Sequence, residues 1–275
     1  MITVLRAGPL TTVQDLGRPG LAHLGVPRSG AADLPALRLA NRLVGNPEGA
    51  AGLETTLLGC ALRFGAGRWV AVTGAPAPVA MGVPFWVPAG GTLEIGTALA
   101  GLRTYLAVGG GLTVPATLGS RATDLLSGLG PAPLRDGDTL PLGHPGPPRA
   151  VDAAPLPPVA AEPVLRLRLG PRHGRLAPDG LRMLGEEAFA VSPDSDRIGV
   201  RLAGPALPRA RTDELPSEPI VLGAVQLPAD GRPVLFLADH PTTGGYPVMG
   251  VLQPADVPAA AQARPGTLLR FRPVP

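Results

Sequence analysis

Two polar runs punctuated by glycine carry most of the side chains that could do chemistry. The first, QDLGRPGLAHLGVPRSGAAD, covers residues 14–33. A loop that feeds the capped start of a helix can aim backbone N–H groups at an anion, with the Ser29 hydroxyl as a further partner. The alternative is structural: Asp15 and Arg18 form a salt bridge within the loop, and Asp33 only caps the helix.

The second run, LADHPTTGGYPVMG, covers residues 237–250 and follows an apolar strand. Asp239 at the end of that strand could orient His240 or bind a substrate ammonium group. The hydroxyls of Thr242 and Thr243, with the amides of the two glycines that follow, offer an oxyanion or phosphate site. The alternative is a hairpin loop that satisfies its own hydrogen bonds.

Two shorter runs combine arginine with aspartate. In SDRIGVRL, Arg197 either pairs with Asp196 or clamps a carboxylate through its two-pronged guanidinium. GSRATD, which contains Arg121, has the same make-up. A triple glycine at residues 109–111 matches no dinucleotide or phosphate-loop pattern and indicates a turn.

Composition excludes several classes of site. The formal charge is +3, and the 24 side chains counted as lysine or arginine are all arginine. Without lysine the chain has no Walker-type phosphate lysine, no Schiff-base lysine and no lysine to carry biotin, so we expect no cofactor bound by this chain. We see no metal-ligand spacing and predict no metal. Scattered arginines and 3% aromatic residues argue against nucleic acid as a ligand.

Apolar segments of four to seven residues, bounded by Gly, Pro, Asp or Asn, predict many short strands. The clearest are residues 2–5, 69–73, 105–108, 164–169, 234–238 and 268–271. Cys60 lies in one apolar run and is expected to be a buried structural thiol. No apolar stretch reaches the ~20 residues of a membrane helix, and the first residues resemble no leader, so we expect a cytoplasmic protein without a membrane partner.

Three segments predict helices. Asp33 caps the first, which Gly45-Asn46-Pro47 ends. Asp256 is expected to cap another, with Pro258 in its first turn and Pro265-Gly266 at its end. A short helix is also predicted over residues 181–187.

The chain between residues 142 and 163 is mostly Gly, Pro and Ala and predicts a linker. We place an N-terminal β lobe at residues 1–146, a Pro/Ala-rich linker at 147–162 and a C-terminal β lobe at 163–275. Each lobe is expected to be barrel-like or sandwich-like, giving a mainly β protein with a few short helices.

Read in order, a series of motifs resembles the biotin-dependent carboxyltransferase family, also called the allophanate hydrolase subunit 2 family. That family includes the C subunit of bacterial 5-oxoprolinase and part of urea amidolyase. The motifs span nearly the whole chain: QDLGRPG, GVPRSGAAD, LANRLVGN, LETTLLG, TGAPAPV, YLAVGGGL, GSRATD, SDRIGVRL, GAVQLP, DHPTTGGYP and ARPGTLLRF.

The resemblance implies two cyclophilin-like β-barrel lobes. It also implies a heteromeric complex with the B subunit, which is kinase-inhibitor-like, and with the A subunit of the same enzyme. The implied reaction is ATP-dependent opening of 5-oxoproline to glutamate, with ATP used by the complex. One alternative is transfer of a carboxyl group from biotin on a partner to urea or a related amide. Another is a non-catalytic antagonist that binds a kinase-inhibitor-like partner.

The resemblance implies that both polar runs and the two shorter runs together form the binding site of a small amide or lactam. His240 stands at a variable position of its motif, so no catalytic role is carried onto it. We predict a catalytic group of Asp239, Thr242, Thr243 and Tyr246. The predicted substrate-binding residues are Gln14, Asp15, Arg18, Ser29, Arg121, Asp196, Arg197 and Gln226.

Overall fold

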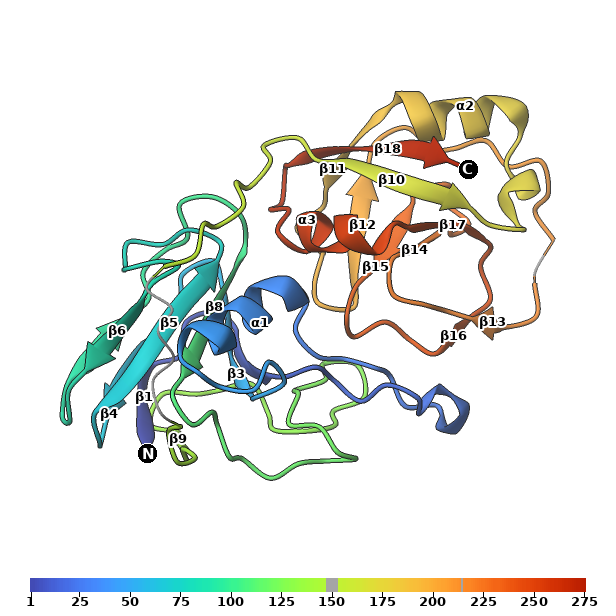
Figure 1. Ribbon diagram of the computed structural model, residues 1–275. Helices are drawn as coiled ribbons and strands as arrows, with labels where there is room; N and C mark the ends of the chain where they lie inside the picture. The colour runs from blue at the N-terminus through green and yellow to red at the C-terminus, as the bar shows by residue number, and fades with distance from the viewer. Residues whose placement is uncertain (147–152, 214) are drawn as a thin grey trace. The chain divides into compact units, whose positions relative to one another are not determined.

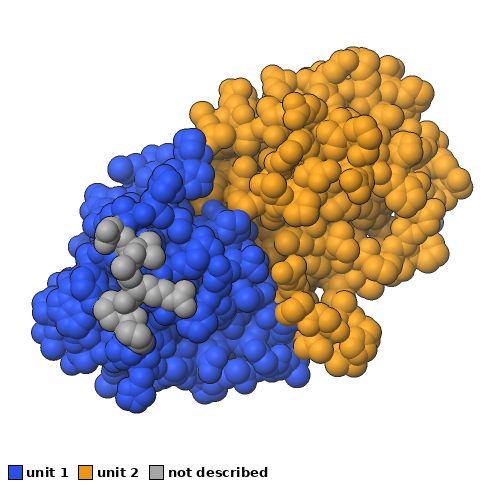
Figure 2. All heavy atoms as spheres, in the orientation of Figure 1, with its two compact units in different colours: residues 1–18, 29–124, 128–159 blue, residues 19–28, 125–127, 160–275 orange. Residues whose placement is uncertain are grey.

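The computed structural model describes residues 1–146, 153–213 and 215–275. It is mainly β, as predicted, and divides into two compact units (Figures 1 and 2). Unit 1 comprises residues 1–18, 29–124 and 128–159, and unit 2 comprises residues 19–28, 125–127 and 160–275. Two short segments from the first half of the chain therefore belong to unit 2. Part of the predicted linker, residues 147–152, lies outside the described residues.

The described residues of unit 1 form two antiparallel sheets and one helix. The five-stranded sheet has the order β2-β3-β8-β5-β6, and the four-stranded sheet has the order β7-β4-β1-β9. The strands are β1 (Ile2–Arg6), β2 (Thr11–Gln14), β3 (Gly52–Thr56), β4 (Ala61–Phe64), β5 (Arg68–Gly74), β6 (Pro84–Val87), β7 (Thr92–Glu94), β8 (Arg103–Val108) and β9 (Thr139–Leu140).

The core of unit 1 is built from inward-facing side chains of both sheets, including Val4 and Phe64 from one and Leu53 and Leu106 from the other. Alternation along each strand sends every second residue to this interior. Cys60 is fully buried in the same cluster, and burial raises the pKa of its thiol to about 12. The thiol is thus a structural group, as the sequence predicts.

Helix α1 (Leu34–Leu43) covers the other face of the five-stranded sheet, against β5 and β8 (Figure 1). The small side chains of Ala71 and Ala107 face it, so the helix can pack close to the sheet. The predicted cap is confirmed, since the Asp33 carboxylate accepts a hydrogen bond from the Ala36 amide at 3.1 Å.

Unit 2 is a closed seven-stranded barrel in the order β10-β17-β14-β15-β12-β11-β18, in which only β10 and β18 pair in parallel. β13 and β16 form a separate ribbon. The strands are β10 (Val164–Leu169), β11 (Ala188–Val191), β12 (Gly199–Ala203), β13 (Glu218–Pro219), β14 (Ala224–Gln226), β15 (Val234–Phe236), β16 (Thr243–Gly244), β17 (Val248–Leu252) and β18 (Leu268–Val274).

The helices of unit 2 are short: α2 (Pro178–Glu186), which packs on β18, α3 (Val257–Ala261), and the 3-10 turns η1 (Ala22–Leu24), η2 (His173–Arg175) and η3 (Pro254–Asp256). Asp256 stands at the start of α3, but its side chain makes no capping bond. The predicted cap is wrong because the carboxylate instead binds Arg166, through the Nε at 2.9 Å and Nη2 at 2.7 Å. No helix in the described part of the chain combines the length and apolarity that a membrane crossing requires.

Candidate functional site

Asp15, just after β2, anchors the loop that carries Arg121. Its carboxylate accepts hydrogen bonds from the Ser120 hydroxyl at 2.6 Å, the Arg121 amide at 2.6 Å and the Gly17 amide at 2.8 Å. Arg18 donates to the Ala122 and Thr117 carbonyls, and no ion pair joins it to Asp15 among the described residues, so the alternative of a salt bridge within the loop is wrong. Arg121 also donates from its Nε to the Val114 carbonyl at 2.8 Å.

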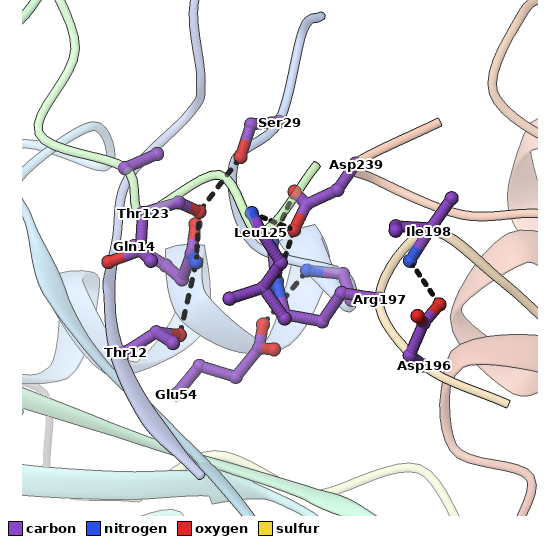
Figure 3. A network of polar contacts seen from close by, with 12 residues as sticks. Thr12, Gln14, Ser29, Glu54, Thr123, Leu125, Asp196, Arg197, Ile198 and Asp239 are labelled. Carbon is purple, nitrogen blue, oxygen red and sulfur yellow. Dashed lines mark hydrogen bonds and ion pairs between the residues drawn. The ribbon is translucent and has the colours of Figure 1, made fainter. Parts of the chain in front are cut away.

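Gln14 and Ser29 converge on a single backbone carbonyl, that of Thr123 (Figure 3). The Gln14 Nε2 donates to it at 2.9 Å and the Ser29 Oγ at 3.0 Å. The Gln14 Nε2 also donates to the Thr12 hydroxyl at 3.0 Å. Unit 1 therefore brings two of the predicted substrate-binding residues onto the GSRATD run.

Arg18 reaches the same run from the other side of the loop. Its Nη2 donates to the Ala122 carbonyl at 2.6 Å, and its Nε lies 3.4 Å from the Thr117 carbonyl. The side chain is buried, and no ion pair to Arg18 is present in the described parts of the chain. A buried guanidinium that faces carbonyls alone is suited to an additional acceptor, preferably one with negative charge.

The backbone around Ser29 is held in an unusual conformation. Ser29 has φ +52°, in the left-handed region that costs a side chain about 1 kcal/mol or more. Gly30 follows with φ +92°, and a Cβ there would lie 2.8 Å from the Gly17 amide nitrogen. The 14–18 loop and the 29–31 loop therefore pack backbone against backbone, which explains the glycine in PRSG.

A second buried network in unit 1 supports the same loop. The Glu54 Oε2 accepts hydrogen bonds from the Tyr105 hydroxyl at 2.8 Å and the Ala32 amide at 3.0 Å, and Arg103 lies 3.5 Å from Oε1. Burial, with the Glu54 charge as a further cause, raises the pKa of Tyr105 well above its usual range. The tyrosine thus stays protonated and holds the Asp33 amide at 2.7 Å.

In unit 2, Arg197 and Asp239 form a fully buried, two-pronged ion pair. Nε and Nη2 of the arginine each lie 3.0 Å from one carboxylate oxygen. The Asp239 carboxylate also accepts a hydrogen bond from the Leu125 amide at 3.1 Å, and Leu125 belongs to unit 2 (Figure 3). In the backbone, the Asp239 amide donates to the Arg197 carbonyl at 3.0 Å. This arrangement fixes the end of β15 to the start of β12.

Asp196 binds the backbone at the start of β12. Its Oδ1 accepts hydrogen bonds from the Ile198 amide at 2.8 Å and the Gly199 amide at 3.0 Å, which makes a turn before β12 (Figure 3). Gln226, at the end of β14, donates from Nε2 to the Tyr246 carbonyl at 2.9 Å. Gln226 therefore positions the backbone of the DHPTTGGYP run.

The remaining predicted catalytic residues lie at the surface of unit 2. Thr243 is exposed in the β13–β16 ribbon, and Thr242 is half-buried with its carbonyl bound by the Ile220 amide at 2.9 Å. The Tyr246 ring is about half exposed, at 49%. The His240 Nδ1 is 2.8 Å from the Pro241 carbonyl, which requires the proton on that nitrogen. The catalytic roles of Thr242, Thr243, Tyr246 and Asp239 stay predictions.

Sequence reasoning missed the parts of these networks that lie far apart in the chain. Thr123, Glu54 and Tyr105 stand in quoted motifs, but no role was assigned to them. The signal for Thr123 is its place in GSRATD, next to the predicted Arg121. Within the described residues, no group of three His, Cys, Asp or Glu side chains is placed to hold a metal ion.

Comparisons with known proteins give consistent results. The family described as "Carboxyltransferase domain, subdomain A and B" matches residues 24–273. The 5-oxoprolinase C subunit of Escherichia coli (strain K12) is 36% identical over 281 residues, covering 98% of this chain and 90% of that protein. Its counterpart in Haemophilus influenzae is 33% identical over 285 residues, covering 100% of this chain and 91% of that protein.

Larger relatives match over a part of their length. Urea amidolyase of Lachancea kluyveri is 35% identical over 98% of this chain, which covers 17% of that enzyme. The crystal structure of TTHA0988 superposes with a TM-score of 0.89 at 39% identity, covering 98% of this chain and 55% of that one. The Kluyveromyces lactis urea amidolyase structure gives a TM-score of 0.93 at 31% identity, and the match covers 100% of this chain and 19% of that one.

Proposed function

The chain belongs to the carboxyltransferase-domain family, subdomains A and B, and on that premise we propose that it is the C subunit of an ATP-dependent 5-oxoprolinase. The complex would cleave 5-oxoproline to glutamate through this chain together with the A and B subunits. The observation that supports this proposal is the length of the match: two 5-oxoprolinase C subunits match over 90% and 91% of their own length. The fungal urea amidolyases align over 16% and 17% of theirs.

The polar groups of unit 1 suit a substrate of this class. 5-Oxoproline is a lactam, and its carbonyl oxygen gains negative charge when the ring carbon is attacked. A buried guanidinium such as that of Arg18 stabilises that charge more strongly than water does, because the surroundings are of low dielectric. In this proposal the chain binds and orients the lactam, and ATP is used by a partner.

The test is reconstitution. The chain is mixed with the A and B subunits of the complex, and glutamate formed from 5-oxoproline is measured with and without ATP. We expect ATP-dependent glutamate from the complete mixture and none when this chain is left out. An Arg182→Ala variant, altered on the exposed face of α2, is the matched control and should retain the activity. A complete mixture that stays inactive would contradict the proposal.

A second candidate is carboxyl transfer to urea or a related amide. It is supported by the superposition on the Kluyveromyces lactis urea carboxylase structure, with a TM-score of 0.93. Because the sequence has no lysine, biotin in such a reaction would be attached to another protein. Adding a biotinylated carrier with its carboxylase, labelled bicarbonate, ATP and urea tests this: label in the urea product favours transfer. A non-catalytic role as antagonist of a kinase-inhibitor-like protein stays a prediction.

A further inference from the structure

The outer face of the barrel in unit 2 gathers four arginines, a clustering that their positions along the sequence do not reveal. Two of them, Arg166 and Arg168, are on β10. The other two, Arg270 and Arg272, are on β18, the parallel neighbour of β10 (Figure 1). The residues that alternate with them are almost fully buried in the barrel: Leu165, Leu167, Leu269 and Phe271. Alternation along each strand therefore directs all four side chains, called the arginine face below, to the outside of the barrel.

Strand pairing holds these side chains close to one another. Arg166 is paired with Arg272 in the parallel ladder, and neighbouring strands lie about 4.8 Å apart. Successive outward residues along one strand, such as Arg166 and Arg168, are about 6.6 Å apart. Both separations are shorter than the Debye length of about 8 Å at physiological ionic strength, so the four charges act together on a ligand.

The arginine face keeps a surplus of positive charge. Within the described residues, the one carboxylate that forms an ion pair with it is Asp256, which binds Arg166. Arg270 donates to a backbone carbonyl, the last one of α2, at 2.7 Å. The side chains of Arg168 and Arg272 make no hydrogen bond or ion pair in the parts of the chain that the structure describes. Four positive charges thus face one negative charge.

This arrangement is unfavourable in the free protein. Like charges that are paired across neighbouring strands repel each other and lower the stability of the sheet. Other exposed arginines of unit 2 are matched with carboxylates, as Arg172 is with Glu218 and Arg182 with Glu186. Because the arginine face lacks such matching, a ligand that supplies negative charge relieves the repulsion and forms charge-assisted hydrogen bonds. The missing charge therefore identifies the ligand as acidic.

The surroundings of the arginine face favour a protein ligand over nucleic acid. The outward residues of β10 and β18 include no aromatic side chain on which a base could stack. Instead, Val164 and Leu268, which are 53% and 40% exposed, start the two strands at the same end of this face and can contact an apolar side chain. Both strands are paired along both edges in the closed barrel, so a ligand binds here through side chains and does not add a strand.

We propose that the arginine face binds an acidic, extended segment of a partner protein. In an extended segment, side chains on one side recur about every 6.6 Å, which is the spacing of Arg166 and Arg168 along β10. Aspartate or glutamate at alternate positions of the segment then meets successive guanidinium groups. The inference goes beyond the proposed function, because it assigns an interaction surface on unit 2 and does not depend on which reaction the complex performs.

Labelled probes test the charge and the class of the ligand. The acidic probe is a peptide of alternating glutamate and threonine, and a glutamine–threonine peptide of the same length is its neutral control. Oligothymidylate with the same number of charges represents nucleic acid. Each probe is titrated with the full chain at low and at physiological salt, and binding is read as fluorescence anisotropy. We expect the glutamate peptide to bind most tightly, with an affinity that decreases as salt is added, and the glutamine peptide not to bind.

Reversing two charges locates the site. Arg168 and Arg272 are exposed, so Arg168→Glu combined with Arg272→Glu should not lower the denaturation midpoint. Binding of the glutamate peptide should weaken about tenfold, because two exposed ion pairs are replaced by repulsion. Arg63→Glu combined with Arg135→Glu is the matched control. It alters two exposed arginines of unit 1, changes the net charge equally, and should retain the binding.

Each outcome decides the inference. An equal loss of binding in the control variant would show a response to net charge alone and would overturn the site. Tighter binding of oligothymidylate, or no binding of the glutamate peptide, would overturn the acidic protein ligand. Dimers that the unaltered chain forms in sedimentation and the reversed variant does not form would assign the face to a second copy instead. If the reversed variant unfolds, Arg168→Gln combined with Arg272→Gln decides by the same comparison.

Discussion

Arg18 in unit 1 and Arg197 in unit 2 are both almost completely buried, but their partners differ. Arg197 meets the Asp239 carboxylate through two bonds of 3.0 Å, and Asp239 is further bound by the Leu125 amide. Arg18 meets two backbone carbonyls and no carboxylate among the described residues. The Arg197 charge is neutralised within unit 2, whereas no described carboxylate of unit 1 neutralises the Arg18 charge.

This difference separates two uses of a buried arginine. A closed ion pair holds two segments together and gains little from a ligand, because both of its charges are already satisfied. A guanidinium with an unsatisfied nitrogen costs stability in the free protein and regains it when an acceptor arrives. Arginines in two polar runs of similar composition can therefore have opposite roles.

The largest effect is expected from breaking the pair in unit 2. Arg197→Met should lower the free energy of unfolding by about 3–5 kcal/mol, because it leaves the Asp239 carboxylate buried and unpaired. Denaturant unfolding measures the loss. Removing both charges with Arg197→Met and Asp239→Leu together should recover much of it.

Arg18→Met is the matched variant in unit 1. It removes a charge that has no carboxylate partner among residues 1–146, 153–213 and 215–275, so the loss should be only about 1 kcal/mol, from the bonds to the carbonyls. Equal losses of stability for Arg197→Met and Arg18→Met would contradict the difference that we draw between the two arginines.

An intermediate effect is expected where Gly130 packs beside Arg18. Gly130→Ala places a Cβ 2.1 Å from the Ala122 carbonyl oxygen in a residue with φ +81°, so overpacking of about 1–3 kcal/mol adds to the backbone strain. Gly119→Ala has a similar φ of +82° and nothing within 4 Å, so only about 1–2 kcal/mol of strain is expected. Denaturant unfolding measures the stability of both variants. Equal effects would mean that the contact with Ala122 does not position Arg18.

The smallest effect is expected on the free energy of unfolding at low pH. The hydrogen bond from Arg166 holds the pKa of Asp256 below its usual 3.8. The folded pKa is the lower one, so this pair stabilises the protein above the unfolded value and the contribution is lost as pH falls through the folded pKa. When the pH is lowered below about 4, the free energy of unfolding should therefore decrease less for Asp256→Asn than for the unaltered chain. Arg18→Met should show the same pH dependence of the free energy of unfolding as the unaltered chain. A different pH dependence would reveal a carboxylate partner of Arg18.

Local signals predict the elements well. The cap at Asp33 and the glycine and proline that follow α1 act within a few residues, and strand alternation shows directly in the burial of β10. Strand order, in contrast, depends on pairings between residues far apart in the chain. The structure closes a barrel in unit 2, while the strands of unit 1 form two sheets around one core.

The failures all involve partners far along the chain. Asp256 binds Arg166, 90 residues away, in place of capping α3, and Asp15 binds Ser120 and Arg121 in place of Arg18. A carboxylate takes the partner that the fold brings to it, and spacing within one loop cannot reveal a donor about a hundred residues away. For the same reason Thr123 had no assigned role.

The burial of Cys60 makes selective labelling of an introduced cysteine possible. It is the only cysteine, and its thiol is fully buried with a pKa of about 12, so it stays protonated and out of reach of thiol reagents in the folded protein. A cysteine introduced at an exposed position would then be the single reactive site without prior removal of the native one. Spectroscopic labels or cross-linkers placed in this way could report when a partner or a small amide reaches either unit.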